Sequence, residues 1–304
     1  MNFRTLIELP PQSFTLTPSS RVLVLGSCFA ENVGRCLCDA LGGDQCAVNP
    51  FGVLYNPRSI AQALELLLLS EEDSLLRLEA TLFEGRDGLW HSWLFSGNFS
   101  AIGREEALQN MQQSLAHARA LVRGEGPLLL ILTFGTDHFY RLKAGGMVVA
   151  NCHKEVPQSF EECVDTVADM TELLHQTVAR FLSACPLADV MFTVSPYRYR
   201  KYGFHASQLS KSRLLLTVDN LLQDAALPTL SDRTTSFCYF PAYEIVLDEL
   251  RDYRFYNPDM LHPSSQAVEY IWERFREWCF APEMAAHYQQ RLKLLKQLNH
   301  RTSH

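Results

Sequence analysis

Arg21-Val-Leu-Val-Leu-Gly-Ser-Cys-Phe-Ala30 is the stretch that decides the fold of this chain. Val22 to Leu25 is a short apolar run rich in β-branched residues, which is typical of a buried strand. Gly26 ends this run, and apolar residues then recur every four positions from Phe29 to Leu41, as they do on one face of a helix. The Ser-Cys pair between them therefore lies on a strand-to-helix turn, at the carboxyl edge of the predicted sheet.

The same alternation of strands and helices continues along the chain. Apolar runs predict further strands at 45–48, 127–134, 147–150, 190–194 and 237–240. Helical spacing predicts helices at 59–69, 104–122, 160–182, 207–222, 243–250, 265–278 and 282–299. Strands that are apolar throughout are typical of a parallel sheet covered on both faces. We therefore expect an α/β fold, a three-layer α/β/α sandwich with a central, mostly parallel sheet of about five strands.

The domain organisation follows from the length and from the absence of a linker. The chain has 304 residues, which one large domain can accommodate, and we expect a single domain over residues 1–304. Aromatic and polar residues alternate between glycines at about 80–100, which predicts a small β-hairpin insertion. Residues from about 264 to 300 are expected to form a C-terminal helical extension.

Composition and charge exclude several classes of protein. The net charge is −7 and the pI is near 5.8, so nucleic acid is not the expected partner, because phosphate binding needs a positive field. No apolar run is long enough for membrane insertion, and the N-terminus does not resemble a signal peptide. The nine cysteines lack the paired spacing of zinc sites, so we expect free thiols, a cytoplasmic location, no metal and no cofactor.

Ser27 and Cys28 are the candidate nucleophiles. A helix that begins at this turn directs backbone N–H groups and a partial positive charge at one point, which stabilises an oxyanion or a thiolate. The structural alternative is that Ser27 only caps the helix and that Cys28 is a small core residue. The turn alone leaves the two interpretations equally open.

Asp259-Met-Leu-His262 supplies the second half of a candidate catalytic centre. An imidazole that accepts a proton from a nucleophile needs a carboxylate to fix its tautomer and to stabilise the imidazolium. An aspartate three residues before a histidine, on one loop, can do this. The alternative is a helix cap made by Asp259 or Ser264 with a surface histidine, but the early nucleophile turn favours the catalytic reading.

Other polar residues follow the predicted strands and are candidates for oxyanion or substrate binding. These are Gly52, Gly135, Thr136, Asn151, His153 and Arg198. Because the carboxyl ends of parallel strands meet at one edge of a sheet, ligands bind there. His138 is expected to be structural or to face the substrate. No glycine-rich phosphate loop is present, which argues against nucleotide hydrolysis.

The chain resembles the GSCFA-domain family, whose first motif stands here as Gly26-Ser-Cys-Phe-Ala30. The resemblance extends through five further segments of the chain, in order. These are Asn49–Pro57, Thr133–Thr136, Asn151–Lys154, Thr193–Pro196 and Asp259–Pro263. It therefore covers most of the chain.

That family in turn resembles the SGNH/GDSL hydrolases, which implies a flavodoxin-like fold and a nucleophile-His-Asp triad. The resemblance implies Asp259 and His262 as triad members and Gly52 as an oxyanion residue. Two positions depart from the pattern. The nucleophile position, two residues after Gly26, holds Cys28 rather than Ser, and the oxyanion Asn is replaced by Asp137, with Asn151 as its candidate substitute.

These observations predict an esterase or O-acyltransferase that acts on an acylated carbohydrate or small metabolite through a covalent acyl-enzyme. Cys28 stands at the nucleophile position, two residues after Gly26, which favours it as the nucleophile. The wider superfamily uses a serine hydroxyl, so Ser27 stays an alternative. An activated donor such as acetyl-CoA is a candidate co-substrate. The alternatives are a ligand-binding module without catalysis that keeps the same pocket, and a scaffold protein that uses the aromatic hairpin as a partner surface.

Overall fold

The computed structural model describes residues 4–223 and 236–302 and contains a central sheet of five parallel strands. The strands are β1 (Arg21–Gly26), β2 (Cys46–Val48), β5 (Leu128–Phe134), β9 (Ala188–Val194) and β10 (Phe237–Tyr239). Their order across the sheet is β2-β1-β5-β9-β10, and every neighbouring pair is parallel. Numbered within this sheet, the order is 2-1-3-4-5, as in flavodoxin-like folds. The predicted α/β fold is confirmed.

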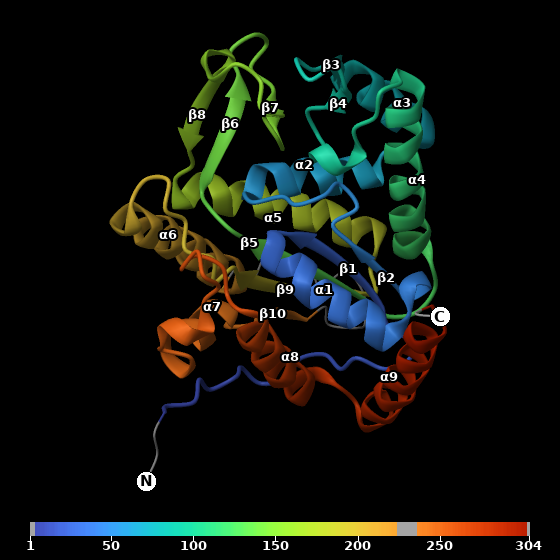
Figure 1. The fold of residues 1–304 in the computed structure, drawn as a ribbon, viewed down its shortest axis with the longest axis vertical. Helices are drawn as coiled ribbons and strands as arrows, with labels where there is room; N and C mark the ends of the chain where they lie inside the picture. The colour runs from blue at the N-terminus through green and yellow to red at the C-terminus, as the bar shows by residue number, and fades with distance from the viewer. Residues whose placement is uncertain (1–3, 224–235, 303–304) are drawn as a thin grey trace.

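Helices cover both faces of this sheet, which gives the predicted three layers (Figure 1). Along β1, Leu23 and Leu25 pack into one apolar core. Val22 and Val24 pack into the other. Because successive side chains of a strand point to opposite faces, an apolar strand fills two cores at once.

The first core lies under helices α2 (Pro57–Leu68), α4 (Arg104–Arg123), α5 (Val167–Ala184) and α6 (Phe204–Gln223). The second lies under α1 (Cys28–Leu41), α8 (Ser265–Cys279) and α9 (Pro282–Thr302). The sequence predicted each of these helices to within a few residues except α5.

The predicted helix at 160–182 is wrong in its first turns. Phe160–Val164 forms strand β8, which pairs antiparallel with β6 (His138–Leu142), and α5 begins only at Val167. Thr166 and Asp169 form a capping box that fixes this start. Phe160 and Val164 match helical spacing, but residues 160–164 pair one to one with β6, and this pairing makes them a strand.

Two small antiparallel sheets stand above α2 in Figure 1. One consists of β6 and β8 with β7 (Val148–Val149), which pairs with β6. The other is the predicted hairpin, formed by β3 (Leu82–Glu84) and β4 (Trp90–Ser92). Strand β6 and the helix α3 (Glu71–Thr81) that leads into the hairpin were not predicted.

The segment at 243–250 is helical but is not a regular α-helix. One turn, α7 (Ala242–Glu244), runs directly into a π-helical turn, η4 (Ile245–Glu249). Short π-helical turns of this kind frequently occur at functional sites. This one lines a cavity beside the candidate site.

Gly26 joins β1 to α1 in a conformation that few other residues adopt. Its φ is +152°, and a Cβ there would lie 2.3 Å from the carbonyl oxygen of Thr133. The loop after β2 holds the two peptide groups that flank Gly26 from the other side. Asn49 Oδ1 accepts the Gly26 N–H at 2.8 Å, and the Leu54 N–H donates to the Gly26 carbonyl at 2.9 Å. The turn that carries Ser27 is thus fixed by β5 and by the β2 loop together.

Substitution of Gly26 tests this constraint. We expect Gly26→Ala to lower the free energy of unfolding by roughly 3 kcal/mol, because either β1 or β5 must shift to admit the methyl group. Urea denaturation measures this loss. Gly43→Ala is the matched control, since a Cβ there meets nothing within 4 Å. Equal effects of the two substitutions would contradict the proposed constraint.

Candidate functional site

A cavity of about 420 Å³ opens at the carboxyl edge of the central sheet. Its size falls within the range of about 300–1,000 Å³ that small-molecule sites occupy. It is lined by residues from six separate segments: Cys28, Tyr55, Asn56, Thr136, His138, Tyr140, Val149, Ala150, Asn151, Cys152, Tyr197, Tyr199 and His262. Of the predicted site residues, the structure thus gathers Cys28, His262, Thr136 and Asn151 around one cavity.

Cys28 is the first residue of α1 and is partly buried. Burial raises the pKa of its thiol, while the N–H groups of Phe29 and of Cys28 itself and the charge of Lys211 oppose this rise. The helix N-terminus therefore stabilises the thiolate without outweighing burial. A thiol in this state needs a base to react at neutral pH.

Ser27 occupies the N-cap position of α1, but its side chain does not cap the helix. The residue is 1% exposed, and its hydroxyl is buried without a hydrogen-bond partner in the described part of the chain. Ser27 does not line the cavity. Its Cβ lies instead against Gly135. The geometry places Cys28, and not Ser27, toward the ligand space.

Asp259 and His262 lie on the loop that precedes α8, and they contact each other directly. Nδ1 of His262 lies 2.5 Å from Oδ2 of Asp259, while Oδ1 accepts the N–H groups of Leu261 and His262 at 2.9 and 3.0 Å. These contacts, led by the bond to His262, lower the pKa of Asp259 to about 2. The carboxylate therefore stays ionised and leaves Nε2 as the free nitrogen of His262.

The loop that carries His262 is held through its backbone and through the imidazole ring. Arg198 donates through its N–H to Leu261 and through Nη1 to the carbonyl of Met260, each at 3.0 Å. The ring of Tyr197 packs on His262 with 4.4 Å between ring centroids.

Ser264, and not Asp259, caps α8, because its hydroxyl accepts the Ala267 N–H. In the described structure no hydrogen bond joins Cys28 to His262; such bonds often form only with substrate bound.

Arg198 lies outside the cavity of Cys28. Its guanidinium stacks over Phe204, Tyr253 and Tyr256, and it lines a second cavity of about 320 Å³ that shares Tyr197 with the first. The prediction that Arg198 binds substrate is therefore corrected for the first cavity: Arg198 holds the loop of His262 instead.

The two glycines predicted to bind the oxyanion do not line the cavity either. The Gly52 N–H donates to Asn49 at 2.7 Å, and the Gly135 N–H donates to Tyr55 at 2.7 Å, so neither donor is free. The Thr136 N–H is also used, by the Tyr55 carbonyl at 2.9 Å. What remains for an oxyanion is the helix N-terminus at Cys28 and the side-chain NH2 groups of Asn56 and Asn151. Their Oδ1 atoms accept the N–H groups of Ser59 and His153.

His153 is buried in the hairpin region and does not face the cavity. Its Nε2 lies 2.9 Å from the Ser92 carbonyl, and its ring packs against Phe83, His91 and Trp93. Burial lowers the pKa of His153 to about 4. The proposed substrate-binding role of His153 is thus replaced by a structural one.

Lys211 is a buried cation behind the site. It is 2% exposed, and Nζ donates to the carbonyls of Gly135 and Ser195 at 2.6 and 2.7 Å, which joins the ends of β5 and β9. Burial lowers its pKa to about 7. The lining residues Tyr55 and Tyr140 were missed, because their position depends on loop packing that no periodicity reports.

Three further properties of the described residues concern disulfides, metal binding and membrane-spanning helices. All nine cysteines are unpaired. Within residues 4–223 and 236–302, no group of three or more histidine, cysteine, aspartate and glutamate side chains is placed to hold a metal ion. In the same residues, no helix combines the length and apolarity needed to cross a bilayer.

Comparison with known proteins identifies a family. The GSCFA family matches residues 21–275 of this chain. No curated protein and no solved structure matches it.

The buried imidazole of His153 predicts a pH dependence of stability. Its pKa is about 4 when folded and about 6.5 when unfolded, so the unfolded state binds more protons between these values. The neutral His153 therefore contributes fully to the free energy of unfolding above pH 6.5, and this contribution is lost as the pH falls toward 4. Between pH 7 and pH 5 we expect the free energy of unfolding to fall by about 2 kcal/mol. Urea denaturation at the two pH values measures it. His153→Gln should remove this part of the slope, and an unchanged slope would contradict it.

Proposed function

The chain belongs to the GSCFA family, and we propose that it is an SGNH-like acyl-transfer enzyme. The proposed reaction is ester hydrolysis or O-acyl transfer on an acylated carbohydrate or small metabolite. The observation that carries the proposal is that Cys28, at a helix N-terminus, lines the same cavity as His262, whose imidazole is bonded to Asp259. Nucleophile, base and orienting carboxylate are the three parts that such chemistry requires.

The steps follow from the positions of these groups. His262 takes the thiol proton, and the Cys28 sulfur attacks the acyl carbonyl of the donor. The developing oxyanion lies near the N-terminus of α1, where the amides of Cys28 and Phe29 already point at the sulfur. The leaving group departs with the proton from His262. Asp259 holds the imidazole in the tautomer with Nδ1 protonated and stabilises its cationic form.

The lining of the cavity supports a carbohydrate or a small polar acceptor. Four tyrosines line it, at positions 55, 140, 197 and 199, together with the amides of Asn56 and Asn151. Aromatic rings with a polar edge offer flat apolar surface and hydrogen bonds together. A cytoplasmic enzyme with this site would take its acyl group from an activated donor such as acetyl-CoA.

Intact-protein mass spectrometry after incubation with p-nitrophenyl acetate, and separately with acetyl-CoA, tests the proposal. We expect one acetyl adduct, mapped to Cys28, because this thiol lies at the N-terminus of α1 and lines the same cavity as His262. Cys28→Ala and His262→Ala should lose the adduct. Ser27→Ala is the matched control and should keep it. An adduct on Ser27 would overturn the assignment of the nucleophile, and a folded protein without any adduct would favour the ligand-binding module.

Asp259→Asn tests the orienting carboxylate. We expect the rate of Cys28 acetylation to fall by about 10²- to 10⁴-fold, because the amide neither fixes the tautomer nor stabilises the imidazolium. The rate of adduct formation measures the effect. Asp44→Asn, an exposed aspartate before β2, is the matched control. Equal rates for the two variants would remove Asp259 from the catalytic centre.

A further inference from the structure

A second histidine, His138, lines the cavity of Cys28 and is not used by the steps above. It belongs to β6, whereas His262 belongs to the loop before α8. Its side chain is 16% exposed, and its Nδ1 is buried without a hydrogen-bond partner in the described part of the chain. Because Nδ1 is buried, the nitrogen that can take a proton from a bound ligand is Nε2, which makes no hydrogen bond in the described part of the chain.

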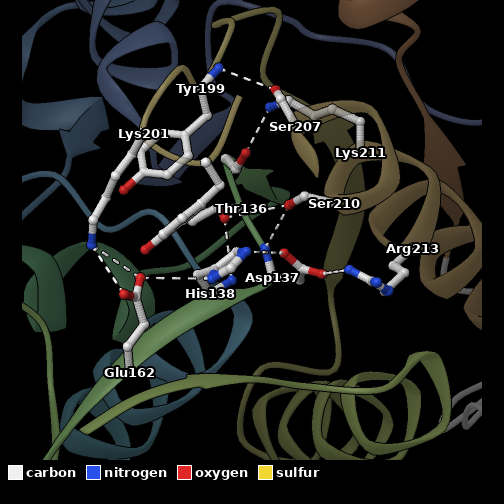
Figure 2. Close-up of polar contacts among 12 residues, drawn as sticks. Thr136, Asp137, His138, Glu162, Tyr199, Lys201, Ser207, Ser210, Lys211 and Arg213 are labelled. Atoms are coloured by element: carbon white, nitrogen blue, oxygen red, sulfur yellow. Dashed lines mark hydrogen bonds and ion pairs between the residues drawn. The ribbon is translucent and has the colours of Figure 1, made fainter. Parts of the chain in front are cut away.

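Two carboxylates flank this imidazole on opposite sides (Figure 2). Oδ1 of Asp137 lies 3.7 Å from Nε2 of His138, and Oε1 of Glu162 lies 3.7 Å from Nδ1. Both exceed hydrogen-bond distance, so the neutral ring is not locked. A proton gained by the ring would be stabilised by two negative charges within reach.

Each carboxylate is itself held in place. Asp137 is fully buried, and its other oxygen pairs with Arg213 at 2.5 Å. Glu162 accepts from Tyr140 at 2.8 Å and from Lys201 at 3.1 Å. Oδ1 of Asp137 has no hydrogen-bond partner in the described chain and is the oxygen that faces His138. The two carboxylates are therefore fixed in position around the His138 ring.

The ring of His138 is also oriented and kept neutral. Tyr202 stacks on it with 4.2 Å between centroids and 15° between planes. Burial lowers the pKa of His138 despite the opposing effect of Asp137 and Glu162. The imidazole is consequently in its basic form at neutral pH, as a general base requires.

We propose that His138 is the general base of the second half-reaction, in which it activates the acceptor hydroxyl that attacks acyl-Cys28. This inference rests on the proposed acyl-transfer function. Two histidines thus act as bases at different steps of the reaction at Cys28. His262 acts while the acyl group is loaded, and His138 acts while it is passed on.

The proposed step transfers the acyl group from the Cys28 sulfur to the acceptor oxygen. His138 takes the proton of the acceptor hydroxyl, which is that of water or of an alcohol, and the oxygen forms a bond to the acyl carbon. The bond between that carbon and the Cys28 sulfur breaks, and the sulfur leaves as a thiolate. The proton held by His138 returns through water to the thiolate. The products are the acid or ester and the free thiol.

The test separates the two half-reactions of the acetylated protein. After brief exposure to p-nitrophenyl acetate and rapid desalting, intact-mass measurements follow the formation and the decay of the acetyl adduct. We expect His138→Gln to form the adduct at the wild-type rate and to keep it with a half-life about 100-fold longer, the size of a typical general-base contribution. Glu162→Gln should also lengthen the half-life, since one stabilising charge is lost.

His205→Gln is the matched control, because His205 is an exposed histidine on α6. It should form and lose the adduct as the wild type does. An adduct on His138→Gln that decays at the wild-type rate would overturn the proposal, and so would equal slowing of formation and decay. The absence of an adduct in every variant and in the wild type would overturn the proposed function, and this inference with it.

Discussion

The close contact of Gly26 with the Thr133 carbonyl is the constraint on which the rest of the site depends. It brings the end of β1 against β5 more tightly than any side chain would allow. Asn49 Oδ1 then accepts the Gly26 N–H, and the Leu54 N–H donates to the Gly26 carbonyl, so the β2 loop holds both sides of this glycine. As a result α1 begins at one fixed point of the sheet edge, and Cys28 is the first residue there to face the cavity.

The chemistry of the site follows from a balance between burial and nearby charge. Burial raises the pKa of the Cys28 thiol and lowers that of the His138 imidazole, so both rest in their neutral forms at neutral pH. Asp259, by contrast, remains ionised through its contact with His262. Neutral reactants beside a fixed charge avoid the cost of burying ions before the reaction begins, and the charges appear only when a proton moves. The proposed division of work between His262 and His138 exploits this arrangement.

Much of the fold could be predicted from the sequence, because apolar strands such as Leu128–Phe134 and amphipathic helices such as α1 carry strong periodic signals. The predicted helix at 160–182 was wrong in its first turns, since apolar spacing does not report the pairing with β6 that makes residues 160–164 a strand. The cavity positions of Cys28 and His262 followed from chain order and strand ends. His153 and Gly52 were misplaced, because their neighbours come from the hairpin, whose packing depends on tertiary contacts alone.

The reactivity of Cys28 toward iodoacetamide tests the coupling of its thiol to His262 most directly. The measurement compares the rate constant of Cys28 alkylation at pH 7, followed by peptide mapping, in the wild type and in His262→Gln. The proposed pairing predicts alkylation at least about tenfold faster in the wild type, equivalent to one pKa unit or more, because only the thiolate reacts. Equal rates in two folded proteins would show that His262 does not act on Cys28 and would contradict the proposed catalytic centre.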